Sequence, residues 1–186
     1  MGDFVVRPAS PQDAAGIARV KIDAWRIAYA PFLDPVVLKA LDVAKETGRW
    51  RERLADWDDD EPVWVAIDGE NVLGFVIAGA NRFPEVACDG ELHAIYVHPD
   101  AQRRGVGQAL VRTAVKFLVD RGFESMVVFV FRDNAIGTSF YRSLGAERCD
   151  GGEFEVAGKN YPDESYVWRS LSEFQERLAQ GSTARS

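Results

Sequence analysis

The segment QRRGVG, residues 102–107, places two arginines and two glycines between an apolar run that predicts a strand and an amphipathic run that predicts a helix. A connection between two such elements needs at most one glycine. Glycines let a ligand come close to the backbone, and the first turn of a helix adds unpaired N–H groups and the positive end of the helix dipole. With two arginines alongside, this combination suits a bound diphosphate.

The loop by itself does not establish which phosphate it binds, or that it binds one. The chain has no GxxxxGK[ST] P-loop, and its GxG, residues 105–107, comes late in the chain and lacks the third glycine of a dinucleotide-binding fingerprint. A purely structural turn explains the two glycines equally well.

The residues around the loop are more specific. The stretch LHAIYVHPDAQRRGVGQALV resembles the acetyl-CoA signature of the GNAT-type N-acetyltransferases, whose Q/R-x-x-G-x-G/A element matches residues 102–107. Further along, NAIGTSFYRSLGAE resembles the second motif of that family. The order of predicted elements is similar to the family over roughly residues 4–170. Together the two motifs indicate a member of this family.

The resemblance implies a mixed α/β (α+β) fold, the GNAT acyl-CoA N-acyltransferase fold, in which helices flank a mostly antiparallel central sheet with one splayed parallel pair. It implies acetyl-CoA as co-substrate and no metal. The loop would hold the pyrophosphate through backbone N–H groups, and the pantetheine arm would pair with the preceding strand. The implied cofactor-binding residues are Ile95, Tyr96, Val97, Gln102, Arg103, Arg104, Gly105, Val106, Gly107, Gln108 and Asn134.

Two residues of the second motif have expected roles in the chemistry. In the family, an amine attacks the thioester in a ternary complex. Asn134 and Tyr141 are seven residues apart, so they return to the same helix face within about 20°. By resemblance, Tyr141 is the general acid near the thioester sulfur and Asn134 contacts the pantetheine arm. Tyr141 could instead only pack its helix onto the sheet, and Asn134 could be a plain N-cap.

The general base is a separate question, because an alkylammonium, with a pKa of about 10, must lose a proton before it attacks. Glu91 lies fourteen residues before Gly105, the offset of the catalytic glutamate in the histone-acetyltransferase branch of the family. Strand alternation places Glu91 on one face with His93, Ile95 and Val97. Glu91 could equally be a salt-bridged residue, and His93 is the alternative base.

The acceptor site is expected near AWRIAYAPFLDP, because the family's acceptor specificity comes from its first two helices and its final hairpin. Trp25 and Tyr29 are four residues apart and face the same way on a helix. With Asp23 or Asp34 nearby, this aromatic pair could receive an ammonium group. Two core aromatics explain the same spacing.

The composition of the chain argues against several other classes of protein. The chain has 186 residues, 47% of them hydrophobic, and a formal charge of −7, which disfavours a nucleic-acid binder. Two cysteines and two histidines make a disulfide framework or a metal cluster unexpected. Without an apolar signal region or a long apolar run, we expect a cytoplasmic protein with no membrane association. A homodimer is possible, because dimers are common in the family.

The elements expected from periodicity form one domain over residues 1–172, followed by a C-terminal tail over residues 173–186. Strands are predicted at 4–9, 63–68, 71–80, 88–97, 125–131, 153–158 and 165–171. Helices are predicted at about 10–25, 35–56 (in one or two pieces), 106–121 and 134–145. The strand and helix around residues 91–131 should form a parallel crossover unit.

The sequence therefore predicts an acetyl-CoA-dependent N-acetyltransferase acting on a primary amine. Small-molecule amines, polyamines included, come first as acceptors, and a protein N-terminus or lysine second. The alternative is a CoA-binding regulatory or sensing module without turnover, because backbone groups alone can bind the cofactor. An intact Tyr141 favours the enzyme.

Overall fold

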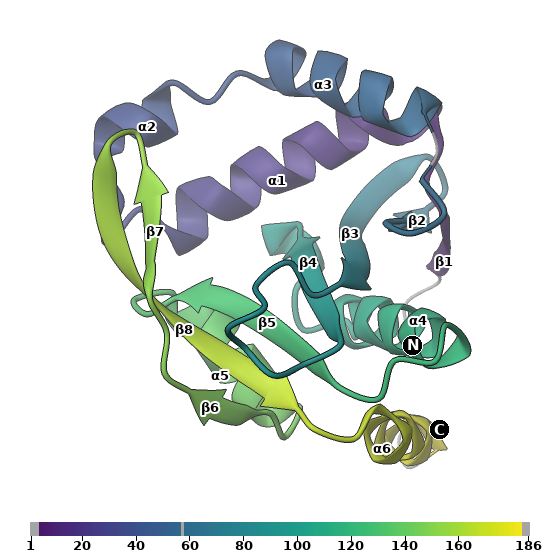
Figure 1. The fold of residues 1–186 in the computed structure, drawn as a ribbon. Helices are drawn as coiled ribbons and strands as arrows, with labels where there is room; N and C mark the ends of the chain where they lie inside the picture. The colour runs from purple at the N-terminus through teal and green to yellow at the C-terminus, as the bar shows by residue number, and fades with distance from the viewer. Residues whose placement is uncertain (1–3, 57, 184–186) are drawn as a thin grey trace.

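A computed structural model of the chain describes residues 4–56 and 58–183, and Figure 1 shows a curved sheet with helices on both faces. The described strands are β1 (Val5–Pro8), β2 (Val63–Asp68), β3 (Asn71–Ala80), β4 (Gly90–Val97), β5 (Met126–Phe131), β6 (Glu147–Cys149), β7 (Glu153–Val156) and β8 (Lys159–Trp168). Their order is β1-β2-β3-β4-β5-β8-β6, with β7 paired to β8. Every pair is antiparallel except β4 with β5, which are joined through a helix and form the expected parallel pair.

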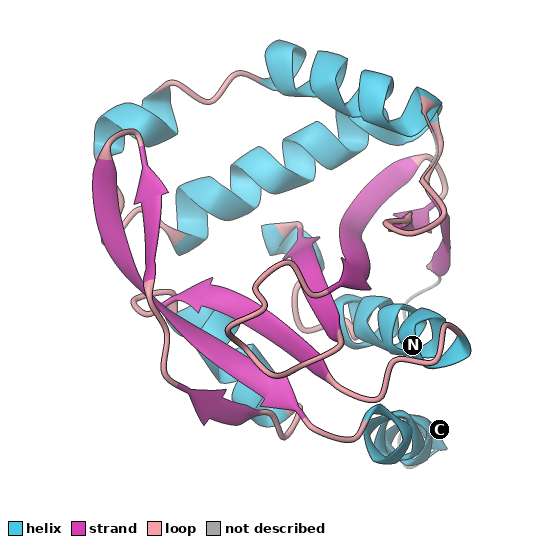
Figure 2. Ribbon diagram, viewed as in Figure 1, coloured by secondary structure: helices cyan, strands magenta, loops and turns pink. Residues whose placement is uncertain are grey.

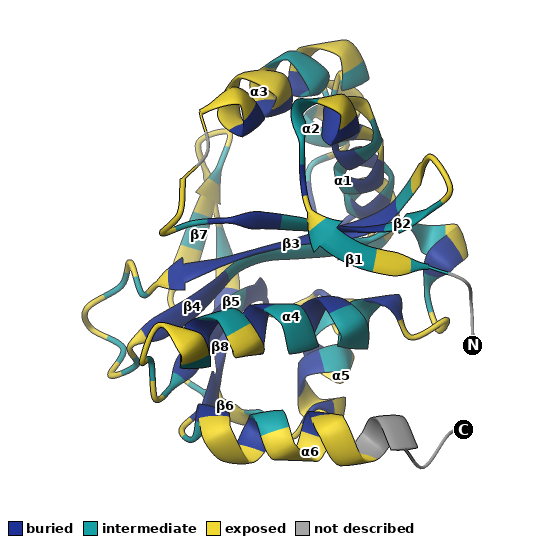
Figure 3. Ribbon diagram, turned by 90° about the vertical axis from the view of Figure 1, so that its right-hand side faces the viewer, coloured by how far each residue is buried: buried dark blue, intermediate teal, exposed yellow. Residues whose placement is uncertain are grey.

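The helices form a layer on each face of the sheet. They are α1 (Ala14–Ala28), α2 (Pro35–Lys39), α3 (Val43–Ala55), α4 (Val106–Asp120), α5 (Ala135–Ser143) and α6 (Leu171–Thr183), with short 3-10 helices η1 (Pro11–Asp13) and η2 (Pro99–Ala101). Figure 3 shows α1 and α3 over one face and α4, α5 and α6 over the other. The sheet is therefore buried on both sides at its centre.

Two apolar clusters hold these layers together. On one side, Ile17 of α1 and Trp50 of α3 pack on the strands at Phe75. On the other, α4 turns a stripe that includes Leu110 and Leu118 toward the sheet, and both side chains are fully buried. Each fully buried aliphatic side chain of this size contributes about 1.5–3 kcal/mol relative to its exposed state. Because both faces of the central strands are covered, their sequences are almost continuously apolar.

Most of the predicted elements are present. The strand pair at 63–68 and 71–80 is joined at Gly69 and Glu70, as the two-residue hairpin signal indicates. The region 35–56 forms two helices, α2 and α3, and β5 is a buried central strand between β4 and β8. Gly122, which follows α4, has φ +84°, the conformation expected of a glycine at a helix C-terminus.

Three predictions need correction (Figure 2). First, α1 runs to Ala28, beyond the expected end at residue 25. Second, residues 173–183, expected as a tail, belong to α6, whose Leu171, Phe174 and Leu178 are buried against the layer of α4. These three apolar residues recur at helical spacing, which is the physical reason that the segment is helical. Third, the last long strand begins at Lys159 rather than 165.

Candidate active site

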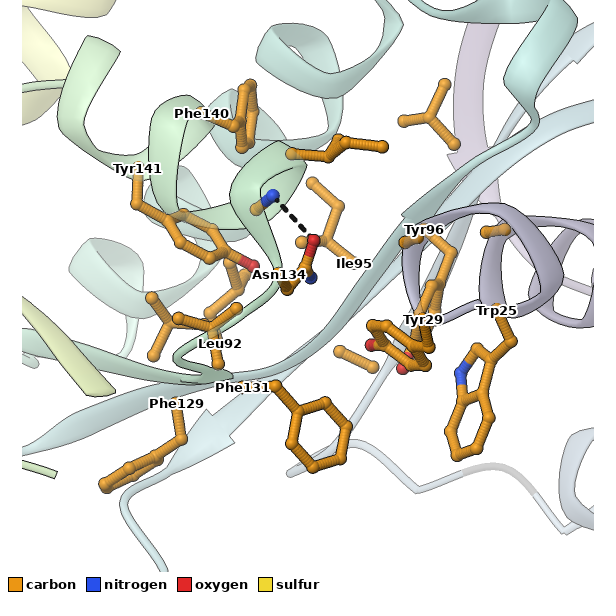
Figure 4. A pocket seen from close by; sticks show the side chains of 18 of the residues that line it. Trp25, Tyr29, Leu92, Ile95, Tyr96, Phe129, Phe131, Asn134, Phe140 and Tyr141 are labelled. Carbon is orange, nitrogen blue, oxygen red and sulfur yellow. Dashed lines mark hydrogen bonds between the residues drawn. The ribbon is translucent and has the colours of Figure 1, made fainter. Parts of the chain in front are cut away.

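A cavity opens where β4 and β5 separate. The two strands pair only through Gly90–Glu91 and Met126–Val127, at the start of each strand. Beyond that point residues of both strands line a cavity of about 520 Å³ (Figure 4). Residues of α1, α5 and β7 line the same cavity. The expected splayed parallel pair is therefore confirmed, and the gap between its strands is the main feature of the site.

A β-bulge in β4 lies at the point where the strands separate. Ala78 of β3 is opposite Leu92 and Ile77 is opposite Ala94, which leaves His93 as one extra residue in β4. A bulge bends its strand and increases the local twist. The bulge thus accounts for the divergence of β4 from β5 immediately after their short paired stretch.

The bulge also corrects the predicted face of Glu91. Leu92, Ile95 and Val97 pack in the cluster under α4, whereas Tyr96 packs in the cluster under α1. Because Glu91 precedes Leu92, strand alternation turns its side chain away from the face of Ile95 and Val97. The expectation that these residues share one face is therefore wrong, since it assumed an unbroken alternation.

Glu91 is buried, with 2% of its surface exposed, and it does not line the cavity. Its carboxylate accepts hydrogen bonds from the backbone N of Arg82 (3.0 Å) and from the guanidinium Nε (3.1 Å) and Nη2 (2.5 Å). His93, which does line the cavity, has its Nε2 at 3.8 Å from the Glu91 carboxylate and 3.0 Å from the carbonyl oxygen of Ala80. His93 thus lies between the Glu91 carboxylate and the cavity.

The loop at residues 102–107 has the backbone of an anion-binding turn. Arg103 and Gly105 have positive φ values of 60° and 87°. Gly105 is the N-cap of α4 and offers no side-chain cap, and the first helical backbone bond is from Ala109 to the carbonyl of Gly105. The N–H groups of residues 106–108 therefore have no helical acceptor, as an anion site requires.

The predicted residues of this loop divide by position. Gln102, Arg103 and Gly107 line the cavity. Arg104 instead approaches Asp68 of β2, at 3.4 Å, and Val106 is buried in the core. Gly105, Val106 and Gln108 are placed to act through backbone rather than through side chains.

The edge of β4 that faces the gap carries unpaired backbone. Ile95, Tyr96 and Val97 pair with β3 on one side, at Val76, Phe75 and Gly74. On the other side, the pairing with β5 has already ended at Glu91. All three residues line the cavity, so their free backbone groups face a space that an extended amide chain can fill.

Helix α5 brings Asn134 and Tyr141 to the same cavity, as their spacing predicts. The Asn134 side chain is an N-cap and accepts a hydrogen bond from the Gly137 backbone at 3.0 Å. Tyr141 is 6% exposed and packs against Tyr166 and Trp168. Figure 4 shows its hydroxyl directed toward the middle of the cavity. Burial raises the pKa of Tyr141, so the phenol keeps its proton.

The opposite end of the cavity is aromatic, and we call it the aromatic end: Trp25 and Tyr29 of α1, Phe131 of β5 and Phe154 of β7. Ring centroids are 5.0 Å apart for Trp25 and Tyr29, 5.1 Å for Tyr29 and Phe131, and 5.2 Å for Phe131 and Phe154. Trp25 and Tyr29 therefore both pack with neighbouring aromatics and line the cavity. Burial and the adjacent Tyr96 hydroxyl raise the pKa of Tyr29.

The two aspartates expected beside this aromatic pair point elsewhere. Asp23 lies 3.4 Å from His98, and Asp34 accepts from Lys159 at 2.5 Å and caps α2. Neither lines the cavity. Sequence reasoning named neither Phe131 nor Phe154, although it expected the final hairpin, which carries Phe154, at the acceptor site. Their strands were predicted, but no local pattern shows which strand from the end of the chain will meet α1.

Comparisons with known proteins agree on one family. A model of the Acetyltransferase (GNAT) family matches residues 24–146, more than half of the chain. An uncharacterized N-acetyltransferase of Bacillus subtilis (strain 168), YuaI, is 34% identical over 168 residues, which are 90% of this chain and 94% of that protein. The mycothiol acetyltransferase of Arthrobacter sp. (strain FB24) is 35% identical over 100 residues, 51% of this chain but 30% of that longer protein.

Among solved structures, the PaiA N-acetyltransferase of Thermoplasma acidophilum in complex with coenzyme A has a TM-score of 0.67 at 19% identity. The alignment covers 90% of this chain and all of that chain, which shows a shared fold. Within residues 4–56 and 58–183, no helix is long and apolar enough to cross a membrane, and no group of three or more His, Cys, Asp or Glu side chains is placed to hold a metal ion.

Proposed function

The chain belongs to the GNAT family of acetyltransferases and is an N-acetyltransferase, and on that premise we propose that it transfers an acetyl group from acetyl-CoA to the primary amine of a small molecule. The observation that carries this proposal is the continuous cavity between β4 and β5, which joins the 102–107 loop to Tyr141 and to the aromatic end. A loop for the cofactor, a proton donor and an acceptor space thus share one volume.

The residues present fit coenzyme A. The N–H groups of residues 106–108 lack helical acceptors and suit the pyrophosphate, while the cavity-facing edge of Ile95–Val97 suits the two amides of the pantetheine arm. Gly107 matters sterically, because a Cβ there would lie 3.1 Å from the Phe140 ring, which also lines the cavity. PaiA, a solved protein of the same fold, is in complex with coenzyme A, which supports coenzyme A as the ligand.

Bound acetyl-CoA supplies a thioester carbonyl for attack and a thiolate leaving group. We place Tyr141 as the general acid for that thiolate, because its hydroxyl faces the cavity and burial keeps the phenol protonated by raising its pKa. Asn134, held by its N-cap bond to Gly137, lines the same part of the cavity and can donate its amide N–H groups toward the arm.

Glu91 stays our proposed general base, acting across His93 rather than directly. The carboxylate is held by Arg82 and lies 3.8 Å from the imidazole that lines the cavity. A proton taken from the amine would pass through His93, or through water beside it, to the Glu91 carboxylate.

The test is thiol release from acetyl-CoA by the purified protein with a panel of primary amines: simple alkylamines, polyamines, amino acids, aminoglycosides and short peptides. We expect release that depends on a small-molecule amine. Release only with peptides would move the acceptor to a protein N-terminus or lysine. Tight CoA binding with no release across the panel would contradict turnover and favour a sensing module.

A further inference from the structure

We propose that the acceptor is a monoamine with an apolar body, a linear alkyl chain or an aromatic ring, rather than a polyamine. This inference rests on the proposed function and assigns the substrate class of the same site. It follows from the charge and surface chemistry of the aromatic end, where the amine must lie if the acetyl group is delivered past Tyr141.

The surface of the aromatic end is mostly apolar. Trp25, Tyr29, Phe131 and Phe154 line it together with Val156 of β7. These side chains belong to one apolar cluster that joins α1, β5 and β7. An apolar ligand gains free energy in proportion to the area that it buries against such a surface, so each added methylene strengthens binding until the space is full.

Negative charge is scarce in the cavity. Among the residues that the structure describes, Glu155 is the only carboxylate that lines it. Glu155 lies between Phe154 and Val156 on β7 and is exposed, while its two neighbours pack inward. Strand alternation therefore turns its carboxylate toward solvent. An ammonium group at the aromatic end finds no carboxylate to neutralise it.

The polar groups that do face this end are neutral. The hydroxyls of Tyr29 and Tyr96 lie close together in Figure 4, and burial together with this neighbour raises the pKa of Tyr29. Two phenols can hydrogen-bond a single amino group, but they cannot balance several positive charges. Burying an unneutralised ammonium is strongly unfavourable, so a second or third ammonium on a polyamine opposes binding.

The same surroundings help the proposed reaction. An apolar environment disfavours the charged form of an amine and lowers its pKa, which favours the neutral nucleophile. The aromatic end thus selects an acceptor with one amino group and promotes loss of its proton before attack. A carboxylate in this space would do the opposite, because it would hold the ammonium in its charged form.

The experiment compares kcat/KM for pentylamine and cadaverine, the diamine of equal length, alongside phenethylamine and spermidine. We expect pentylamine and phenethylamine to exceed cadaverine and spermidine by about tenfold or more. In the series from propylamine to pentylamine, kcat/KM should rise by about fourfold per methylene. Equal or higher kcat/KM for cadaverine or spermidine would overturn the inference while leaving the proposed function intact.

A negative charge introduced at the aromatic end tests whether the amine acceptor binds there. Val156→Glu adds a carboxylate on the inward face of β7 and should raise the cadaverine-to-pentylamine ratio of kcat/KM by about tenfold. Asn160→Glu adds the same charge on the same hairpin, at an exposed position opposite Glu155, and should leave the ratio unchanged. Calorimetric CoA binding verifies that both variants fold. An unmoved ratio in Val156→Glu that still binds CoA would contradict the placement, and absence of release with every amine would defeat the proposed function itself.

Discussion

Replacement of Gly105 by valine should weaken coenzyme A binding by about a hundredfold or more while leaving the protein folded. Gly105 has φ +87°, and a Cβ built on it meets no atom within 4 Å. Valine there therefore has a backbone penalty but no clash with the protein. The left-handed region is unfavourable for a non-glycine residue by about 1–2 kcal/mol, and β-branching adds to this. For a chain of this length, that loss lowers the melting temperature by roughly 2–8 °C.

The expected loss of affinity is larger than the loss of stability. The valine side chain would stand in front of the N–H groups of residues 106–108, which have no helical acceptor. Hydrogen bonds to a charged group contribute about 1.5–3 kcal/mol each. Loss of two such bonds to the pyrophosphate weakens CoA binding by roughly a hundredfold to ten-thousandfold.

Gly122 provides a matched control at the other end of the same helix. Its φ is +84°, and a Cβ there also meets nothing within 4 Å. Gly122→Val therefore carries the same backbone penalty and the same open surroundings, at the opposite end of α4 from the loop. Thermal denaturation should show similar losses for both variants, while calorimetry with CoA should separate them. If Gly105→Val binds CoA within about threefold of Gly122→Val, backbone approach to a phosphate is not the reason for the glycine.

Two further substitutions test the proposed acid and base. Tyr141→Phe should lower kcat by about a hundredfold and leave the affinity for CoA unchanged. Because burial raises the pKa of the Tyr141 phenol, this loss of kcat should be constant from about pH 6 to about pH 9. An unchanged kcat would show that Tyr141 takes no part in the chemistry. Glu91→Gln and Arg82→Gln each break the ion pair between the buried Glu91 carboxylate and the exposed Arg82 side chain and should destabilise the fold by about 1–3 kcal/mol, but only Glu91→Gln should lower kcat, because it removes the proposed base. Equal losses of kcat in both variants would assign Glu91 a positioning role.

The fold was predictable wherever local chemistry is decisive. Gly69 and Glu70 indicate a hairpin. The apolar stripe of α4 indicates a helix with one buried face, and the continuous apolar run of β5 indicates a central strand. The backbone of the 102–107 loop was predictable for the same reason, since glycines and a helix start are local features. Helix α6 could also have been found, because Leu171, Phe174 and Leu178 recur at helical spacing. The aromatic end could not, because Phe131 and Phe154 meet α1 only after the sheet has formed.

The bulge at His93 shows why Glu91, the proposed general base, was the hardest residue to place. Residues of the run LHAIYV pack against apolar clusters on both faces of the sheet, so its apolar residues carry no alternation that one extra residue could interrupt. An offset of fourteen residues from Gly105 counts positions along the chain, but the bulge changes the face on which each position lies. The same residue that separates β4 from β5, and so frees the backbone of Ile95–Val97 for a ligand, turns Glu91 toward Arg82. Opening the gap between β4 and β5 and holding that carboxylate behind the cavity wall are therefore two consequences of one inserted residue.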